Sequence, residues 1–453
     1  MKRREFLENS AKGLTGLALG SSLLSNLACS KNLTETPNII IIVSDDTGWN
    51  DVGYHNSQIK TPNIDRLASE GAELNYFYVS PTCSPTRAAL MTGRHPSRYA
   101  ILGPIVGGMK ETLPKGTRTL AEHLRQNGYQ TAITGKWHLG LKPEDGPKQF
   151  GFDYTYGYFH GQIDPITHLY KWGDKTWHRN DDYIDEEGHV TDLITNEAVK
   201  YVNEIRNKTK PFFLYVPYSA PHFPIDEDQK WLDYYPDVEN LERRKYCASM
   251  THMDDGIGQI IKSLEKNNLI KNSIIIYMSD NGGCENFRSG PDYYGNKFPP
   301  AEVLGDNKPL RGWKQELYEG GIRVPALFYW QDKVNPVRIN EVIAVEDLYP
   351  TISYLTRSDV PKDHLTEGVN IWHAIEGKKI PERTLYWRTD KQFAVRKGEW
   401  KLIYNGDISE PDSTELYNLI LDPYEKENLA DFNKSIMEVL SEEIKKQAQL
   451  DPL

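Results

Sequence analysis

Oxygen-bearing side chains follow two apolar segments of the chain, at the point where each segment ends. Residues 44–46 (Ser-Asp-Asp) come after the apolar segment 38–43, and residues 279–281 (Ser-Asp-Asn) come after the segment 273–278. Three carboxylates held close together repel one another strongly unless a cation lies between them. A ligand set made only of oxygen favours Ca²⁺ or Mg²⁺ over Zn²⁺. Each cluster alone is better explained as turn chemistry, but together they predict a metal site. Its expected ligands are Asp45, Asp46, Asp280 and Asn281.

Basic side chains follow two further apolar segments. Lys136 and His138 come after the segment 131–134, and His222 comes after the segment 212–216. Because side chains alternate along an extended chain, Lys136 and His138 are expected on the same side. A lone His is more often structural, and a lone Lys is more often solvated. Beside a predicted oxygen cluster, these residues instead indicate a site for an oxyanion with acid–base groups next to it.

One cysteine stands at the start of a predicted helix, in the sequence Cys-Ser-Pro-Thr-Arg of residues 83–87. Ser84 is a good N-cap and Pro85 a good first helical residue, so the free N–H groups of the first turn lie near Cys83. These groups favour negative charge, and Arg87 lies one turn further along. By these rules alone, Cys83 is expected to be an activated thiolate.

The elements that must hold these residues have the pattern of an α/β layered fold. The four apolar segments are typical of strands buried on both faces, and amphipathic helical segments lie between them. In such folds ligands bind beyond the carboxyl ends of the strands, where the candidate residues lie. From about residue 361, short strand-like segments separated by turns, followed by a last helix, indicate a small antiparallel sheet. We therefore predict a large domain over 36–360 with a large, mostly parallel mixed sheet, and a smaller subdomain over 361–453.

Composition excludes several classes of protein. The 453 residues include 53 Lys and Arg against 64 Asp and Glu, which gives a net charge of −11. An acidic chain is not expected to coat nucleic acid, because phosphate binding needs a surplus of basic side chains. Four cysteines in this length do not form a disulfide framework, and Cys247 and Cys284 are interpreted as small buried hydrophobic residues.

The first residues have the features of an export signal. Residues 1–28 combine a basic start with an apolar stretch too short and too rich in Gly for a membrane span. Cys29 directly follows, in a context similar to the cleavage site of a bacterial lipoprotein. We predict an exported protein of the bacterial periplasm or cell surface. Attachment to the membrane through a lipid on Cys29 and an ordinary cleaved signal peptide are both consistent with the sequence.

The Cys-x-Pro-x-Arg pattern of residues 83–87 resembles the signature of the type I, formylglycine-dependent sulfatases. Residues 128–138 resemble the second signature of that family, with Lys136 and His138 at its end. Within the family, residues 48–53, 151–158 and 310–312 are most similar to arylsulfatase B, the N-acetylgalactosamine-4-sulfatase type. The resemblance covers nearly all of the chain after the signal. Its further segments are residues 61–65, 219–222, 279–283 and 309–325.

The resemblance implies an alkaline-phosphatase-like fold and hydrolysis of a sulfate ester on a carbohydrate. It implies that Cys83 is oxidised to Cα-formylglycine by a formylglycine-generating or an anaerobic sulfatase-maturating enzyme. It also implies that the four oxygen ligands and the modified Cys83 hold Ca²⁺ rather than Mg²⁺. One hydroxyl of the hydrated aldehyde would attack sulfur, and the second would then expel sulfate by collapse to the aldehyde.

The same resemblance implies a role for each basic residue of the site. Arg87 and Lys136 would stabilise the formylglycine and sulfate oxygens, and Lys314 would bind the sulfate and the bridging oxygen. His222 would protonate the leaving alcohol, and His138 would be the base that triggers collapse. Lys136, His222 and Lys314 are therefore also expected to contact the substrate.

The sugar itself is not predicted, because residues 160–183 depart from the arylsulfatase B pattern. His160 in this segment is a candidate substrate contact, and the aromatic residues of 172–177 are candidates for sugar stacking. A glycosaminoglycan and an algal polysaccharide such as ulvan or carrageenan are both consistent with the sequence. Two alternative functions are a phosphate or phosphonate monoester hydrolase of the same superfamily and a non-catalytic, glycan-binding surface lipoprotein.

Overall fold

The computed structural model describes residues 36–55, 58–107, 109, 112–288, 290 and 292–452. From Pro37 onward the chain forms one compact unit. The predicted signal peptide at 1–28 and the predicted lipid site at Cys29 lie outside the described residues. In the part of the chain that the structure describes, no helix is both long and apolar enough to span a bilayer.

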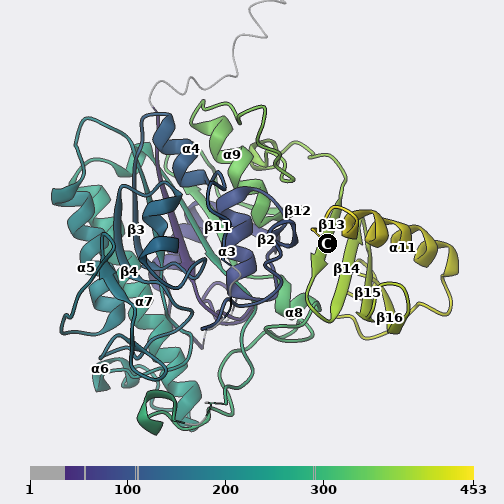
Figure 1. Cartoon of the computed structure of the whole chain (residues 1–453), viewed down its shortest axis with the longest axis horizontal. Helices are drawn as coiled ribbons and strands as arrows, with labels where there is room; N and C mark the ends of the chain where they lie inside the picture. Colours follow the sequence, from purple (N-terminus) through teal and green to yellow (C-terminus); the bar gives the residue numbers. More distant parts are fainter. Residues whose placement is uncertain are drawn as a thin grey trace, which may run out of the picture. The chain divides into compact units, whose positions relative to one another are not determined.

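A mixed sheet of ten strands forms the centre of this unit (Figure 1), in the order β12-β2-β11-β10-β1-β9-β3-β4-β7-β8. Its central strands are parallel: β1 pairs with β9 and β10, and β3 pairs with β9 and β4. Antiparallel pairs, such as β10 with β11 and β4 with β7, lie outside this centre. The strands are β1 (Asn38–Ser44), β2 (Ala72–Tyr78), β3 (Gln130–Lys136), β4 (Tyr154–Tyr158), β7 (Trp177–Arg179), β8 (Asp182–Tyr183), β9 (Phe212–Pro217), β10 (Ser273–Ser279), β11 (Ala326–Trp330) and β12 (Val337–Ala344). A separate small hairpin consists of β5 (Leu169–Tyr170) and β6 (Asp174–Lys175).

The central strands are apolar along their whole length because both faces of the sheet are covered. Every residue of β1 and β10 is buried, which is the pattern expected of parallel strands between two helix layers. In the register of this pair, Ser44 lies opposite Ser279, so both strands end at the same level. The residues that follow β1 and β10 therefore begin side by side, as the sequence predicts.

Helices cover both faces of the sheet. Ile40 and Ile42 of β1 belong to one apolar cluster with Leu67, Ile194 and Ile257, which come from α2, α5 and α7. On the other side of the sheet α3 lies beside α4 and α9 (Figure 1). The helices are α2 (Pro62–Glu70), α3 (Cys83–Thr92), α4 (Leu120–Gln126), α5 (Val190–Lys200), α6 (Gln229–Leu232), α7 (Leu241–Lys266), α8 (Glu319–Ile322), α9 (Leu348–Leu355), α10 (Trp372–Ile375) and α11 (Lys434–Ala448). Shorter helical turns are η1 (Pro96–Tyr99), η2 (Pro143–Asp145), η3 (Pro147–Phe150), η4 (Tyr201–Ile205), η5 (Ile270–Asn272), η6 (Tyr293–Asn296) and η7 (Val345–Asp347).

The C-terminal part of the chain forms a four-stranded antiparallel sheet in sequential order, followed by α11. Its strands are β13 (Thr384–Arg388), β14 (Gln392–Lys397), β15 (Trp400–Gly406) and β16 (Pro411–Asn418). One face packs with Tyr78 and Ile322 of the large-sheet region, and the other face packs against Leu440 and Ile444 of α11. The α/β class with a small C-terminal antiparallel sheet, predicted from the sequence, is confirmed.

Buried charged groups connect the C-terminal part to the rest of the unit. Lys401 Nζ lies 3.1 Å from Glu319 Oε1 and 2.8 Å from Glu425 Oε1, and all three side chains are at most 1% exposed. Arg98, just after α3, pairs with Glu367 and with Asp451 near the C-terminal end of the described chain. Each of these buried charges has an oppositely charged partner, because an unpaired charge at such depth is strongly unfavourable.

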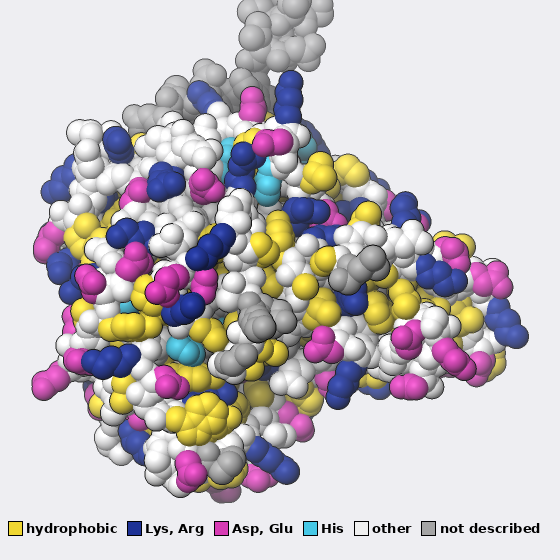
Figure 2. Space-filling view, in the orientation of Figure 1, with side chains coloured by type: hydrophobic (Ala, Val, Ile, Leu, Met, Phe, Trp, Pro, Cys, Tyr) yellow, Lys and Arg dark blue, Asp and Glu magenta, His cyan; other side chains and the backbone are white. Residues whose placement is uncertain are grey.

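Charges of both signs are spread over the surface. Figure 2 shows Lys and Arg side chains interspersed with Asp and Glu over the described part of the face in view. The described part of that face carries no continuous basic patch. Attraction of this face for an anion must therefore come from a few locally placed cations.

Candidate active site

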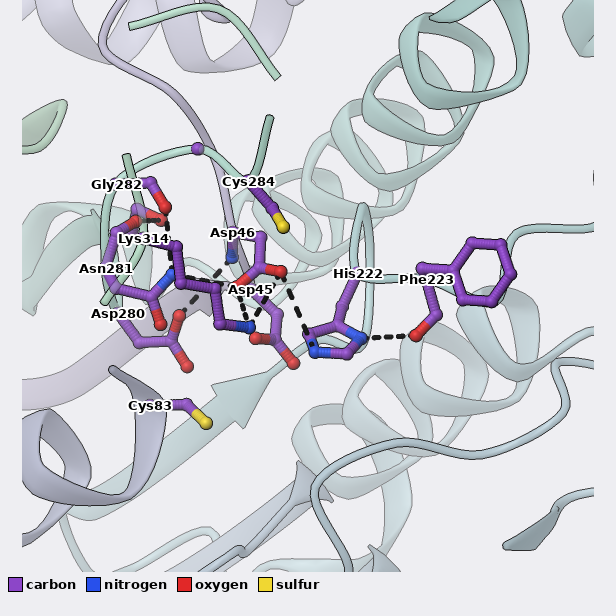
Figure 3. A network of polar contacts seen from close by, with 12 residues as sticks. Asp45, Asp46, Cys83, His222, Phe223, Asp280, Asn281, Gly282, Cys284 and Lys314 are labelled. Atoms are coloured by element: carbon purple, nitrogen blue, oxygen red, sulfur yellow. Dashed lines mark hydrogen bonds and ion pairs between the residues drawn. The ribbon is translucent and has the colours of Figure 1, made fainter. Parts of the chain in front are cut away.

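The oxygen-bearing residues after β1 and β10 form one buried cluster (Figure 3). The backbone N–H of Asp46 donates to Asp280 Oδ1 at 3.4 Å, and Asn281 Nδ2 donates to Asp46 Oδ1 at 2.7 Å. Asp45, Asp280 and Asn281 are fully buried, and Asp46 is 3% exposed. The structure thus brings together the four residues that the sequence singles out as metal ligands.

Two oxygen atoms of this cluster lack a hydrogen-bond partner among the described residues, although both are buried: Asp45 Oδ1 and Asn281 Oδ1. A buried oxygen without a partner is unfavourable, and a bound cation removes that penalty. Ligand atoms of Asp45, Asp46 and His222 also lie within 4.8 Å of one another. The free oxygens and the donor set therefore fit a hard divalent cation.

Three cationic side chains surround the carboxylates. Lys136 Nζ donates to Asp45 Oδ2 at 2.6 Å, and Lys314 Nζ donates to both oxygens of Asp46, at 2.6 and 2.8 Å. Arg87 donates to Asp280 Oδ2 from Nε at 3.0 Å and from Nη2 at 2.7 Å. Three cations balance three carboxylates, so adding a divalent cation together with an anionic substrate keeps the buried charge low.

The pKa values of the three carboxyls differ because their surroundings differ. Burial raises the pKa of Asp45, and burial together with the charge of Asp45 raises the pKa of Asp280 to about 6. Burial also acts to raise the pKa of Asp46, but Lys314 and then His222 outweigh it and lower the pKa to about 2. Asp46 is therefore the carboxylate that stays ionised most firmly.

Cys83 is the first residue of α3 and faces this cluster (Figure 3). The predicted cap is wrong: the N-cap position belongs to Thr82, and the Ser84 hydroxyl instead donates to the carbonyl of His138 at 2.9 Å. The position at the helix start alone favours an activated thiolate, but burial raises the pKa of the unmodified Cys83 thiol against the opposing effect of Lys136. The unmodified thiol is thus a poor nucleophile at neutral pH.

His138 is oriented toward Cys83. Its Nδ1 lies 3.1 Å from Cys83 Sγ, and its Nε2 lies 2.9 Å from the carbonyl oxygen of Ile105. Since a carbonyl only accepts, Nε2 carries the proton, and Nδ1 is the free acceptor that faces residue 83. Burial and then the charge of Lys136 lower the pKa of His138 well below its usual value. His138 and Lys136 both face the site, as expected, while Trp137 packs against Phe150 and Phe152.

His222 lies beside Asp46 (Figure 3). Its Nδ1 donates to the backbone carbonyl of Phe223, and its Nε2 lies 3.7 Å from Asp46 Oδ2. Burial and the charge of Lys314 lower the pKa of His222 to about 3. Because Nδ1 donates to Phe223, Nε2 is the nitrogen that faces Asp46.

His160 lies beside the site rather than in its ion-pair network. Its Nδ1 contacts the Thr176 hydroxyl at 2.8 Å, and its ring stacks on Tyr170 with centroids 4.2 Å apart. Burial lowers its pKa to about 4. The neighbouring Gly161 provides the link to the site, because its backbone packs directly against the His138 ring.

Two residues near the site, Ser84 and Cys284, have contacts that the sequence does not predict. Ser84 accepts from the N–H of Ile105 at 3.1 Å while it holds His138, so two distant segments meet at one hydroxyl. Cys284 lies beside Lys314 and Asp46 (Figure 3), and burial raises the pKa of its thiol to about 12. Its position directly after residues 279–283 is the signal that the sequence offers. A cysteine by itself, however, is more simply interpreted as a small buried hydrophobic residue.

Comparisons with known proteins agree with this geometry. A protein-family model described as Sulfatase matches residues 37–358. Arylsulfatase J of Mus musculus is 30% identical over 88% of this chain and 73% of its own length. N-acetylgalactosamine-6-sulfatase of Homo sapiens is 30% identical over 81% of this chain and 71% of its own length. The crystal structure of Ps i-CgsB in complex with k-i-k-neocarrahexaose superposes with a TM-score of 0.83 at 30% identity, covering 92% of this chain and 94% of that chain.

Proposed function

The chain belongs to the sulfatase family and hydrolyses sulfate esters, and from that premise we propose that its substrate is a sulfated carbohydrate. Two of the similar proteins support this: one is named for N-acetylgalactosamine-6-sulfate, and another was crystallised with a neocarrahexaose. The substrate is an oligosaccharide or polysaccharide of the glycosaminoglycan or the algal type. The N-acetylgalactosamine-4-sulfatase type stays a prediction, as do export and lipid attachment at Cys29.

The observation that carries the proposal is the convergence of Cys83, His138, Lys136 and Lys314 on the buried carboxylates. The matured protein would carry formylglycine at position 83, made by a maturating enzyme, and it would hold Ca²⁺ at Asp45, Asp46, Asp280 and Asn281. The hydrated aldehyde supplies an oxygen nucleophile, and the ion supplies positive charge beside the sulfate. The carboxylate and amide oxygens of these four residues suit a hard cation such as Ca²⁺. The two oxygens without a hydrogen-bond partner support that choice.

The protein's own residues then divide the remaining work. Lys136 and Lys314 hold positive charge next to the position where sulfate oxygens would lie, and Arg87 keeps Asp280 in place. His138 accepts a proton at Nδ1 from a hydroxyl on residue 83, since Ile105 fixes its tautomer. His222 is the candidate acid for the leaving alcohol, which requires a proton on Nε2. An anionic sulfate bound nearby favours that protonated form against burial.

A substrate comparison with the matured protein tests this proposal. Peptide mass analysis first verifies that Cys83 has been converted, and sulfate or phosphate release is then measured. The substrates are 4-nitrophenyl sulfate, 4-nitrophenyl phosphate and hexasaccharides of carrageenan, chondroitin sulfate and heparan sulfate. We expect sulfate release from at least one hexasaccharide and none from a Cys83→Ala control. A matured protein that releases no sulfate from any hexasaccharide, or that prefers the phosphate ester, would refute the proposal.

A further inference from the structure

A lysine surrounded by aromatic rings lies at the tip of the β5–β6 hairpin. Lys171 Nζ lies 5.0, 6.0 and 4.7 Å from the ring centroids of Tyr170, Trp172 and Tyr293. Trp172 is 61% exposed, and its ring meets Tyr293 edge to face with centroids 4.9 Å apart. We call Tyr170, Lys171, Trp172 and Tyr293 the aromatic–lysine cluster.

The ion pairing of Lys171 differs from that of the lysines near it. Among the described residues, no carboxylate forms an ion pair with Lys171, whereas its neighbour Lys175 pairs with Asp185 at 3.2 Å. Lys297, close by in the same region, pairs with Asp226 at 2.9 Å. The Lys171 side chain is half-buried, and the chain as a whole has a net charge of −11. Aromatic faces hold such a cation in place without neutralising it, so it stays available to an anion.

The cluster is built by two chain segments that lie far apart in sequence. The N–H of Tyr294 donates to the carbonyl of Lys171 at 2.6 Å, and Gln162 Nε2 donates to the Tyr294 hydroxyl at 2.9 Å. Within the hairpin, Gly173 N–H donates to the carbonyl of Tyr170 at 2.7 Å. These hydrogen bonds fix the backbone on both sides of the rings, so the backbone that carries the exposed Trp172 is held in place.

The cluster connects directly to the active site. Tyr170 stacks on His160, and the next residue, Gly161, packs so closely on His138 that a Cβ there would lie 2.4 Å from the ring. His138 in turn contacts Cys83. One imidazole ring and one backbone segment thus separate the cluster from the catalytic centre.

We propose that the aromatic–lysine cluster is a second binding subsite, which takes an anionic sugar residue next to the one that loses its sulfate. The apolar face of the pyranose lies on Trp172, and its sulfate or carboxylate pairs with Lys171. This inference rests on the proposed function, because it requires a glycan substrate with more than one anionic residue. It makes the enzyme selective for oligosaccharides over single sulfated sugars.

Kinetics of matched variants test the subsite. Trp172→Ala, Lys171→Gln and Lys171→Arg are compared with wild type on 4-nitrophenyl sulfate and on the hexasaccharides named above. Phe432→Ala, a change of another strongly exposed aromatic side chain, is the control. We expect KM for the best hexasaccharide to rise about 3- to 10-fold in Trp172→Ala and Lys171→Gln, with kcat nearly unchanged. Lys171→Arg should retain most of the affinity, and turnover of 4-nitrophenyl sulfate should not change.

Salt and sugar type separate the contributions. Raising NaCl should raise KM for wild type more steeply than for Lys171→Gln, because the ion pair is screened. A Lys171 effect on chondroitin sulfate but not on neocarrahexaose identifies a uronate carboxylate as the anion, and an effect on both identifies sulfate. Unchanged hexasaccharide kinetics in both Trp172→Ala and Lys171→Gln would overturn the subsite, as would an equal loss on both substrate sizes. If wild type hydrolyses none of the hexasaccharides, the proposed function fails, and binding titration of the same variants still decides the subsite.

Discussion

His138 Nδ1 lies 3.1 Å from Cys83 Sγ, and the hydrogen bond from its Nε2 to the Ile105 carbonyl fixes which nitrogen faces the cysteine. Ser84 holds the backbone of both His138 and Ile105, so one hydroxyl sets the position of the ring and of the carbonyl that orients it. The residue next to the nucleophile position therefore positions the base.

The close packing of Gly161 on His138 gives a first prediction. In Gly161→Ala the new methyl would lie 2.4 Å from the ring and would push Nε2 away from Ile105. We expect kcat for 4-nitrophenyl sulfate to fall about 100-fold, because small displacements of catalytic groups have effects of that size. Gly103→Ala is the matched control, since no atom lies within 4 Å of its Cβ position. Equal activity of the two variants would contradict the orienting role of the Ile105 bond.

The unpartnered oxygens of Asp45 and Asn281 predict dependence on a hard cation. Treating the matured protein with EDTA should lower both Tm and sulfate release, and Ca²⁺ should restore both, because an ion that binds only the native state stabilises it. Asp45→Asn should weaken Ca²⁺ binding at least about 10-fold in a calorimetric titration, since it removes a charged ligand. Asp332→Asn, at an exposed position, should leave binding unchanged. A Tm that does not respond to Ca²⁺ at millimolar concentration would count against the metal site.

His252 predicts a dependence of stability on alkaline pH. Its ring lies between Glu227 Oε2 at 2.8 Å and Asp192 Oδ1 at 3.1 Å. Burial acts to lower its pKa, but the two carboxylates raise it to about 9, from an ordinary value of 6.5. The protonated ring therefore stabilises the fold fully below pH 6.5, and this contribution disappears as the pH rises through 9.

Urea unfolding of wild type and His252→Gln at several pH values measures this contribution. After allowance for the partial exposure of Asp192, the difference in unfolding free energy should be about 1–2 kcal/mol near pH 6. It should shrink toward zero between pH 6.5 and 9.5. His373→Asn, at an exposed position, should show no such trend. A difference that stays constant over this range would mean that the charge of His252 does not matter.

Lys401 predicts a large loss of stability on removal of one buried charge. Lys401→Met removes the cation closest to Glu319 and Glu425, and Glu319 keeps the longer pair with Arg323 at 3.9 Å. Breaking a buried pair in this way costs about 3–5 kcal/mol of unfolding free energy. Burial raises the pKa of Glu425 to about 7, so the added Glu425→Gln change should recover part of the loss. Lys397→Met breaks a half-exposed pair with Glu443 and should cost far less. Similar losses in the two lysine variants would show that burial does not amplify the effect.

The sequence predicts the candidate site well where chemistry follows directly from a strand end. Residues 44–46, 136–138 and 279–281 each come after an apolar segment, and the parallel register brings them to one edge of the sheet. The fold class follows from the same segments. These inferences need only local pattern and the general geometry of parallel sheets.

Contacts set by tertiary packing are not predictable in this way. The hydroxyl of Ser84 has local capping as its intrinsic preference, but it bonds to residues 21 and 54 positions away. Cys284 directly follows residues 279–283, but its residue type gives no sign that its thiol lies beside Lys314 and Asp46. His160 has side-chain chemistry suited to a substrate contact, yet its Nδ1 contacts the hydroxyl of Thr176, between β6 and β7. In each case a decisive neighbour lies outside the local segment of the residue, and its placement depends on the complete fold.

The pairing of Arg98 with Asp451 has a consequence for biosynthesis. A ribosome completes α3 and Arg98 long before Asp451, which lies 353 positions after Arg98 in the chain. Until then a guanidinium that is 2% exposed in the finished structure lacks one of its two acidic partners. Because an incompletely paired charge resists burial, we expect the region directly after the Cys83 helix to close only once Asp451 has been added.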